Sequence, residues 1–201
     1  MNIVALILNM AISITDKFGY IGVIIVMLLD YSCIPIPTEI IIPLIGCGVA
    51  EGKYKFIYAI LFAVIGGTIG SLVSYTIGYY GGNPVINWIQ KKFKSSKKGF
   101  DLIHKLFEKY GKIVVLVGRI IPLTRIYVSL IAGAEKINKF QFAIYSAVGI
   151  AIWTTGMEVL GYYLGHNMEL IAHLIARFSI AISIISIIGL IIFINYKKRK
   201  V

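Results

Sequence analysis

Two acidic and two basic side chains interrupt apolar stretches of this chain, and their chemistry is the most informative feature of the sequence. Asp30 and Glu39 flank a proline-rich break, and Arg119 and Arg125 flank a second break in the sequence GRIIPLTR. An ionised side chain at the centre of a membrane helix costs about 2.5–3.5 kcal/mol, so four unpaired charges would cost roughly 10–14 kcal/mol. Opposite charges that meet would offset much of this cost and would line a wet, charged cavity.

These four charges allow two interpretations, which are compatible with each other. They are either structural ion pairs that lock the two breaks together or a site for an anionic head group. Because a guanidinium group binds phosphate bidentately, Arg119 and Arg125 are candidate ligands for a lipid phosphate. Asp30 and Glu39 are candidate counter-charges or proton sites, since a phosphate that competes for the arginines would leave a displaced carboxylate to take up a proton.

Prolines accompany both pairs of charges. Pro35 and Pro37 lie between the carboxylates, and Pro122 lies midway between the arginines. Residues six apart on a straight helix do not share a face. A bend at proline allows both side chains of a pair to point into one cavity. We therefore predict that these three prolines are the hinge positions of the two breaks.

The composition indicates an all-α integral membrane protein. The chain has 201 residues, of which 58% are hydrophobic and 14% are charged, against about 25% charged residues in a soluble domain. Its mean hydropathy is +0.86. The net charge of +11 does not indicate nucleic-acid binding, because the basic residues gather beside apolar segments in KKFKSSKKGF and YKKRK. That distribution is typical of cytoplasmic loops next to anionic lipid.

The apolar segments on either side of each break are too short to cross a membrane. The arms 18–29 and 40–50 have about half of the roughly 20 residues that a spanning helix needs. We predict two re-entrant helical hairpins that turn near residues 34–37 and near Pro122, although a single kinked helix is the alternative for the first. Irregular backbone at that depth requires cover from protein or water. Complete spans are predicted at 56–82 and 140–165.

The chain is predicted to form a single membrane domain, residues 1–201, with an inverted repeat. Residues 1–15 either span the membrane or lie at its interface. The predicted parts are a first repeat with a re-entrant hairpin (18–82), a basic cytoplasmic amphipathic loop (83–112), a second repeat with a re-entrant hairpin (113–165) and a C-terminal transmembrane helix (168–194).

The order of features repeats along the chain. The series FGYIGV, EGKYKF and GYYGG is parallel to YGKIVV, EKINKF and GYYLG. Interrupted apolar segments at equivalent places in two repeats indicate the binding site of a transporter. The positive-inside rule places the basic loop and the KKRK tail in the cytoplasm. The first hairpin then opens outward and the second inward, with their tips near the midplane, but the lysines of EGKYK lie outside against the rule.

Several of these motifs resemble the DedA family of bacterial membrane proteins, also described as SNARE-associated or VTT-domain proteins. The resemblance covers residues 18–165 and rests on Asp30 with PIPTE, GGTIGSLVSYTIGYYGG, GRIIPLTR, AGA and the W…G…GYYLG pattern. The family often has Glu where this chain has Asp30, a change that keeps the charge.

The resemblance implies inverted re-entrant hairpins and lipid movement across the bacterial cytoplasmic membrane. The positive-inside rule gives this multi-pass protein a cytoplasmic C-terminus. The implied substrate is undecaprenyl phosphate, returned across the membrane in dependence on the proton-motive force. Phosphatidylethanolamine or another phospholipid, moved by a flippase or scramblase, is the alternative. The family's functional residues correspond to Asp30, Glu39, Arg119 and Arg125.

Other classes of protein fit less well. A lipid-phosphate phosphatase needs a nucleophilic histidine near its phosphate clamp, and His104, His166 and His173 lie away from both breaks. We therefore predict no enzyme activity, no metal and no cofactor. An ion or proton exchanger remains an alternative, and the sequence leaves open a homo-oligomer and the role of Glu158. The expected partners are membrane lipids, with no nucleic acid.

Overall fold

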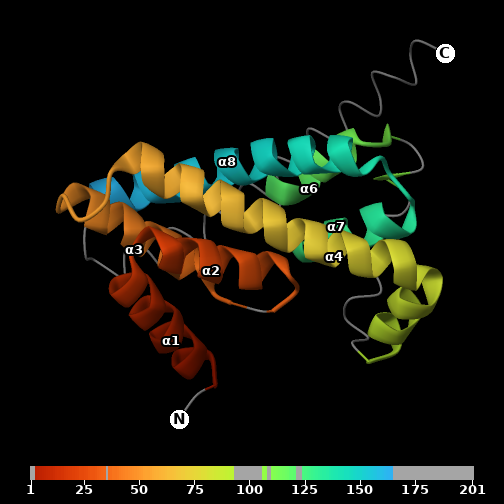
Figure 1. The fold of residues 1–201 in the computed structure, drawn as a ribbon, viewed down its shortest axis with the longest axis horizontal. Helices are drawn as coiled ribbons and strands as arrows, with labels where there is room; N and C mark the ends of the chain where they lie inside the picture. Colours follow the sequence, from red (N-terminus) through yellow and green to blue (C-terminus); the bar gives the residue numbers. More distant parts are fainter. Residues whose placement is uncertain (1–2, 35, 93–105, 108–109, 121–123, 165–201) are drawn as a thin grey trace.

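The computed structural model describes the chain except for residues 1–2, 35, 93–105, 108–109, 121–123 and 165–201. The described part is all-helical, which confirms the predicted secondary-structure class (Figure 1). The helices are α1 (Ile3–Phe18), α2 (Tyr20–Tyr31), α3 (Thr38–Ala50), α4 (Phe56–Lys92), α6 (Ile113–Ile120), α7 (Arg125–Ala134) and α8 (Lys139–Leu164).

Two helical segments in the described part are long and apolar enough to cross a membrane. They are Phe56–Gly82 of α4 and the whole of α8, with 27 and 26 residues. Both agree with the predicted spans to within one residue. Gly82 ends the first segment because its φ of 51° bends the chain between two helical stretches that continue to Lys92. The predicted basic segment therefore begins as a helix.

The surfaces of these two long helices carry apolar stripes that face away from the rest of the protein. On each helix a large exposed side chain recurs at nearly every fourth position, which is the spacing of one helix face. An exposed apolar surface of this extent is unusual for a soluble monomer and suits contact with lipid. The exposed residues are Ile57, Leu61, Ile65, Ile69, Val73 and Ile77 on α4, and Phe140, Ile144, Val148 and Ile152 on α8.

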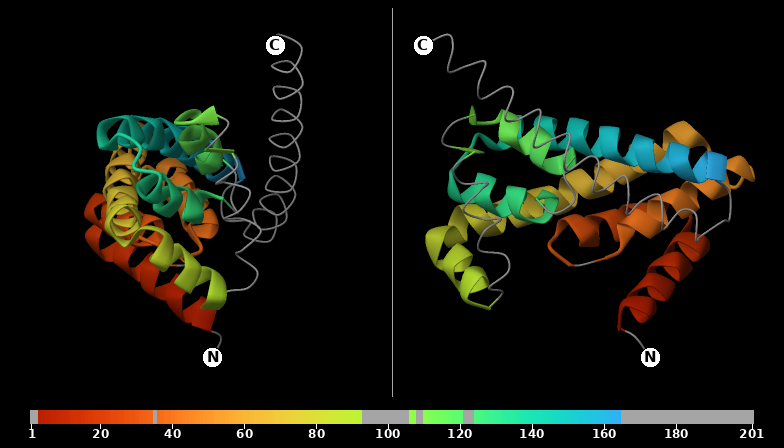
Figure 2. Two further views of the ribbon diagram at one scale, coloured as in Figure 1. Left: turned by 90° about the vertical axis from the view of Figure 1, so that its right-hand side faces the viewer. Right: turned by 180° about the vertical axis from the view of Figure 1, so that it is seen from behind.

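The four short helices α2, α3, α6 and α7 divide between the two long ones in a repeated order. In the first half, α2 packs against α4 and α3 packs against α8. In the second half, α6 packs against α8 and α7 packs against α4. The first short helix of each half (α2 or α6) thus contacts the long helix that follows in its own half. The second short helix (α3 or α7) contacts the long helix of the other half. Figures 1 and 2 show the α2–α3 pair and the α6–α7 pair approaching from opposite ends of the long helices.

The crossing of α3 with α8 depends on two glycines. A Cβ atom on Gly161 would lie 1.9 Å from the carbonyl oxygen of Pro43, and one on Gly46 would lie 2.2 Å from that of Glu158. Pro43 lies three residues before Gly46, and Glu158 lies three residues before Gly161, so each glycine packs against the turn that leads to the other. Small residues of this kind allow helix backbones to approach closely in a membrane, where packing contributes much of the association energy.

The crossing of α4 with α7 has the same construction. A Cβ on Gly78 would lie 2.0 Å from the carbonyl oxygen of Leu130, and one on Gly133 would lie 2.0 Å from that of Tyr75. Again each carbonyl comes three positions before the opposite glycine. Gly78 and Gly161 are the glycines of the two G-Y-Y motifs, so the recurring motif marks two equivalent helix crossings.

The tyrosines of these motifs lie at the ends of the membrane-length segments. Tyr79 and Tyr80 pack edge to face with ring centroids 5.2 Å apart, and Tyr162 and Tyr163 do so at 5.3 Å. Tyr80 and Tyr163 are both at least 80% exposed. Because α4 and α8 run in opposite directions (Figure 1), the two pairs occupy opposite ends, as expected for aromatic belts at two membrane surfaces.

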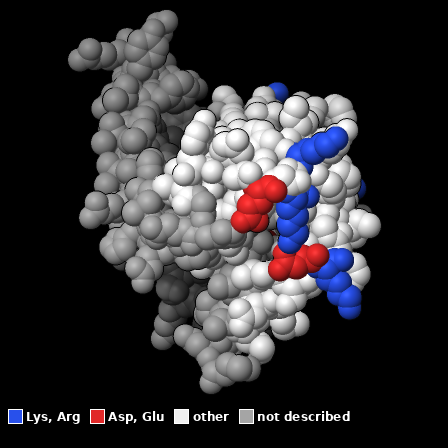
Figure 3. All heavy atoms as spheres, turned by 90° about the vertical axis from the view of Figure 1, so that its left-hand side faces the viewer, with Lys and Arg blue, Asp and Glu red and all other residues white. Residues whose placement is uncertain are grey.

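The end of the protein that holds the EGKYK turn carries charges of both signs. Figure 3 shows acidic and basic side chains next to each other on this face. Lys53 forms an ion pair with Asp16 near the end of α1. That hydrogen bond raises the pKa of the Lys53 ammonium. The lysines of this turn still count against the orientation expected from the positive-inside rule, which depends on basic residues and not on net charge.

We expect Gly161→Ala to lower the melting temperature of the purified protein in detergent, because its new methyl group would overlap a backbone oxygen. Overpacking of this kind costs about 1–3 kcal/mol. Gly156→Ala is the matched control on the same helix, since nothing lies within 4 Å of its added Cβ, and Ala stabilises a helix by up to about 1 kcal/mol over Gly. Equal melting temperatures for the two variants would contradict the close crossing.

Candidate functional site

Arg125 joins three of the short helices at the centre of the described structure. It is the first residue of α7 and is only 5% exposed. Its Nη2 atom donates to Glu39 Oε1 at 2.6 Å and to Thr38 Oγ1 at 3.0 Å. Asp30 Oδ2 lies 3.6 Å from the same nitrogen and accepts a 2.9 Å hydrogen bond from the Thr38 hydroxyl. The two carboxylates of the first break therefore face one guanidinium of the second.

The local backbone explains how the two carboxylates come together. Asp30 is in the last turn of α2, and Glu39 is in the first turn of α3, where the helix dipole favours a negative charge. The chain reverses between them through Cys33, whose φ is 68°. Pro37 immediately precedes α3 with φ −75°, a value that its ring fixes. The break between the helices thus brings together two acids that are distant on any continuous helix.

Arg119 lies in the same region but has different partners. It is completely buried in the last turn of α6. Its Nη1 donates to the Arg125 carbonyl oxygen at 3.0 Å, and its Nη2 donates to the hydroxyls of Ser129 at 2.7 Å and Ser146 at 3.2 Å. Among the described residues no carboxylate lies within ion-pair distance of it. Arg119 therefore connects α6, α7 and α8 through neutral acceptors.

Aromatic rings cover both guanidinium groups. The ring of Tyr31 lies 5.1 Å from the Arg119 Cζ atom and 6.0 Å from that of Arg125. Phe142 lies 5.7 Å from Arg119, and Trp153 lies 5.7 Å from Arg125. Contacts of a guanidinium with a desolvated ring face contribute favourable electrostatic energy. The Tyr31 ring thus contacts both guanidinium groups.

The arrangement leaves hydrogen-bond donors unused. Within the described part of the chain, Arg119 Nε and Arg125 Nη1 have no hydrogen-bond partner although both atoms are buried. Buried polar atoms in folded proteins normally have partners. The side chain of Glu39 is 28% exposed, whereas that of Asp30 is 5% exposed. Glu39 is therefore the more accessible of the two acids next to Arg125.

Glu158, on α8, is a second buried acid besides Asp30. It is completely buried, and neither carboxyl oxygen has a hydrogen-bond partner among the described residues. The hydroxyl of Thr154, one turn earlier on α8, also lacks a partner there. Sequence reasoning left Glu158 open because its burial depends on the close crossing of α8 with α3.

The structure brings together some of the predicted site residues and does not describe others. Arg125 meets Asp30 and Glu39, while Arg119 bonds to the Arg125 carbonyl oxygen and to two serine hydroxyls. Pro35 and Pro122 fall outside the described residues. No cluster of three or more His, Cys, Asp or Glu side chains that could hold a metal occurs within the described ranges.

Sequence reasoning did not identify the hydroxyl groups that complete the site. Thr38 bridges Asp30 and Arg125, and Ser129 and Ser146 bind Arg119. Ser and Thr are common in apolar helices, where they often bond their own backbone, so their residue type gives little signal. The position of Thr38 next to Glu39, and of Ser129 one turn after Arg125, was the only available indication.

Two helices are long and apolar enough to cross a membrane, and the charges of Arg125, Asp30 and Glu39 lie together among the helices. These features define the chain as a helical membrane protein. Residues 34–163 match the VTT domain. The chain belongs to this family, known also as DedA, which confirms the resemblance seen in the sequence motifs. No solved structure is significantly similar to it.

Three relatives show the range of descriptions within the family. "Undecaprenyl phosphate transporter A" of Bacillus subtilis is 32% identical over 91% of this chain and 90% of its own length. "Alkaline phosphatase-like protein" of Lactococcus lactis subsp. cremoris is 29% identical over 94% of this chain and 91% of its own length. "Inner membrane protein YqjA" of Escherichia coli is 27% identical over 73% of this chain and 67% of its own length.

Replacing Thr38 by Val should destabilise the protein, because it removes the hydroxyl that both accepts from Arg125 and donates to Asp30 while keeping the side-chain volume. Loss of such a buried partner costs about 1–3 kcal/mol. Thr38→Ser is the matched control and should unfold near the wild-type temperature in detergent. A Val variant as stable as the Ser variant would show that the bridge contributes nothing.

Proposed function

We propose that this chain moves an anionic lipid phosphate across the cytoplasmic membrane, with undecaprenyl phosphate as the first candidate substrate. The observation that carries this proposal is the buried pair Arg119 and Arg125, each with an unused N–H group in the described structure. Arginine is suited to phosphate because its planar fork binds two oxygens and keeps its charge when buried. Glu39, the more exposed of the two acids, is the group that a phosphate replaces.

The names of relatives support a transporter but also include an enzyme-like description. The Bacillus subtilis relative is named for undecaprenyl phosphate transport, and the Lactococcus relative is named as alkaline phosphatase-like. We infer transport without catalysis, because the side chains that contact the arginines are hydroxyls, carboxylates and aromatic rings. The three histidines of the sequence lie outside the described residues.

Other lipids and ions are the alternative substrates. The head group of phosphatidylethanolamine also contains a phosphate, so a phospholipid flippase or scramblase would use the same arginines. An ion or proton exchanger would use the carboxylates without moving lipid. Reconstituted protein tested with undecaprenyl phosphate, with phosphatidylethanolamine and with no lipid substrate separates these three functions.

The repeated packing order supports two re-entrant hairpins in an inverted arrangement. α2 and α3 have 12 and 13 residues and α6 and α7 have 8 and 10, all too short to cross a membrane. Their charged ends meet at Arg125. We place the turn 51–55 outside, and the turn 135–139 and the C-terminus in the cytoplasm. The two hairpins then open on opposite sides and share one central site.

Proton coupling follows from competition for Arg125. With no substrate bound, Arg125 compensates the charges of Glu39 and Asp30. A phosphate that binds Arg125 leaves Glu39 next to a like charge in a poorly solvated site, and a proton on Glu39 relieves the repulsion. Lipid binding and proton uptake are linked in this way, so a proton gradient can drive the head group across.

The orientation is tested with Glu51→Cys and Glu135→Cys, equivalent exposed residues of the two turns, in a chain whose native cysteines are replaced. A membrane-impermeant maleimide added to whole cells should label the residue 51 variant. It should label the residue 135 variant only after the membrane is opened. Labelling of both turns from the same side would rule out the inverted arrangement.

Arg119→Ala and Arg125→Ala should each abolish lipid translocation in proteoliposomes, because each removes a buried phosphate ligand. Lys should restore little activity at either position, since an ammonium cannot bind two oxygens in a fixed plane. Each variant must first be shown to insert and to remain monodisperse in detergent. Wild-type rates for both Lys variants would remove the bidentate role.

Glu39→Gln should still bind lipid phosphate but lose the response of translocation to an imposed pH gradient, because the amide cannot take up the coupled proton. Asp30→Asn is the matched comparison at the more buried acid. The measurement is lipid translocation with and without the gradient. If both variants keep the wild-type response, the carboxylates are structural and transport is not coupled through them.

A further inference from the structure

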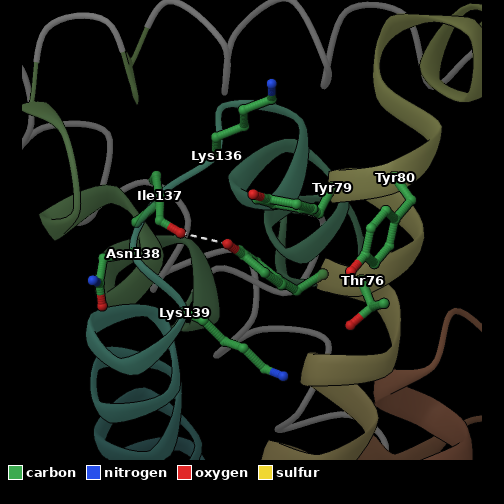
Figure 4. A pocket seen from close by; sticks show the side chains of 8 residues that line it. Thr76, Tyr79, Tyr80, Lys136, Ile137, Asn138 and Lys139 are labelled. Atoms are coloured by element: carbon green, nitrogen blue, oxygen red, sulfur yellow. Dashed lines mark hydrogen bonds between the residues drawn. The ribbon is translucent and has the colours of Figure 1, made fainter.

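A cavity lies at the end of the protein where the α7–α8 turn meets α4 (Figure 4). Its volume is about 360 Å³, within the range of roughly 300–1,000 Å³ that is typical of small-molecule sites. One wall comes from α4 and the other from the turn between α7 and α8. The lining residues are Tyr75, Thr76, Tyr79, Tyr80, Lys136, Ile137, Asn138 and Lys139; we refer to it as the Tyr–Lys cavity.

Neither lysine of the Tyr–Lys cavity has a charged partner in the part of the chain that the structure describes. Within the described residues no carboxylate forms an ion pair with Lys136 or Lys139, and Figure 4 shows their ammonium groups on opposite sides of the bond between Tyr75 and Ile137. The cavity at the opposite end of the protein, about 170 Å³ in volume, is different. It is lined by Asp16, Glu51 and Lys53, so two acids outnumber one base.

The remaining polar atoms of the Tyr–Lys cavity favour an anionic ligand. Asn138 Oδ1 accepts from the backbone N–H groups of Phe140 and Gln141, so these amides are already used. The Tyr75 hydroxyl donates to the Ile137 carbonyl oxygen. Among the described residues, the side-chain donors that remain for a ligand include the two ammonium groups, the Asn138 amide and the hydroxyls of Tyr79 and Tyr80. Figure 4 shows the Tyr79 hydroxyl pointing toward the turn.

Two stacked rings connect the Tyr–Lys cavity with the arginine site. Tyr75 lines the cavity, and its ring stacks on Phe142 with centroids 4.7 Å apart. Phe142 in turn lies 5.7 Å from the Arg119 Cζ atom. At the other edge of the cavity Tyr80 is 83% exposed, at a helix end where aromatic side chains meet lipid head groups. The cavity therefore lies between the expected membrane surface and Arg119.

We infer that the Tyr–Lys cavity is a second anion site, which binds the phosphate group of a lipid at the membrane surface, separate from the central arginines. The ammonium groups of Lys136 and Lys139 neutralise the phosphate, and Tyr79 and Tyr80 contact the first part of the lipid chain. Exchange of the head group between this cavity and Arg119 rests on the proposed transport function. Binding in the cavity does not.

The test is isothermal titration of the full chain, purified in uncharged detergent, with dihexanoyl phosphatidic acid. We expect Lys136→Gln with Lys139→Gln to weaken one class of site by about tenfold or more, because two charged hydrogen-bond donors are lost. Lys53→Gln with Lys55→Gln removes the same charge at the opposite end and should leave binding unchanged. Binding that is the same in both double variants would overturn the inference.

Two further experiments distinguish the second anion site from the proposed transport site and from a site for simple inorganic ions. The Arg119→Ala, Arg125→Ala double variant should still bind dihexanoyl phosphatidic acid through the lysines, and loss of all binding in it would overturn the second site. If that variant still translocates lipid, the transport proposal fails while the cavity result stands. Inorganic phosphate should bind the cavity at least tenfold more weakly, and equal affinity would contradict a lipid ligand.

Discussion

The compensation of buried charge around Arg125 is the constraint on which the rest of the structure depends. A guanidinium that is 5% exposed is costly in an apolar interior unless acceptors surround it. Those acceptors come from the ends of α2 and α3, so α7 is held against the other hairpin at one point. The ends of α2 and α3 and the start of α7 must lie next to one another for this contact to form. The irregular backbone at the ends of α2 and α3 is therefore needed to place the charges.

The glycine crossings provide the rigidity that this contact requires. At both crossings a glycine faces the backbone carbonyl three residues before its opposite glycine, so the second arm of each hairpin is fixed to the long helix of the other half. Of the four charged groups near this contact, Glu39 has the most exposed side chain.

Much of this arrangement could be predicted from the sequence, and the remainder depends on tertiary contacts. Apolar length identified the spans, because a helix must match the membrane thickness. The charges at the two breaks were recognisable because ionised residues are rare in apolar segments. Sequence spacing does not show that Arg125 alone meets the carboxylates while Arg119 binds serine hydroxyls, since that depends on how α6 and α7 are rotated. The burial of Glu158 and the Tyr–Lys cavity likewise arise where distant segments meet.

The most direct test of the central claim is a double-mutant cycle between Glu39 and Arg125, measured as unfolding free energy in detergent with Glu39→Gln, Arg125→Gln and the combination. Direct contact predicts a coupling energy of about 1–3 kcal/mol. Saturating dihexanoyl phosphatidic acid should reduce this coupling, because the phosphate replaces Glu39 at the guanidinium. Coupling below about 0.5 kcal/mol, or coupling that the lipid phosphate does not change, would contradict a site in which substrate and carboxylate compete for Arg125.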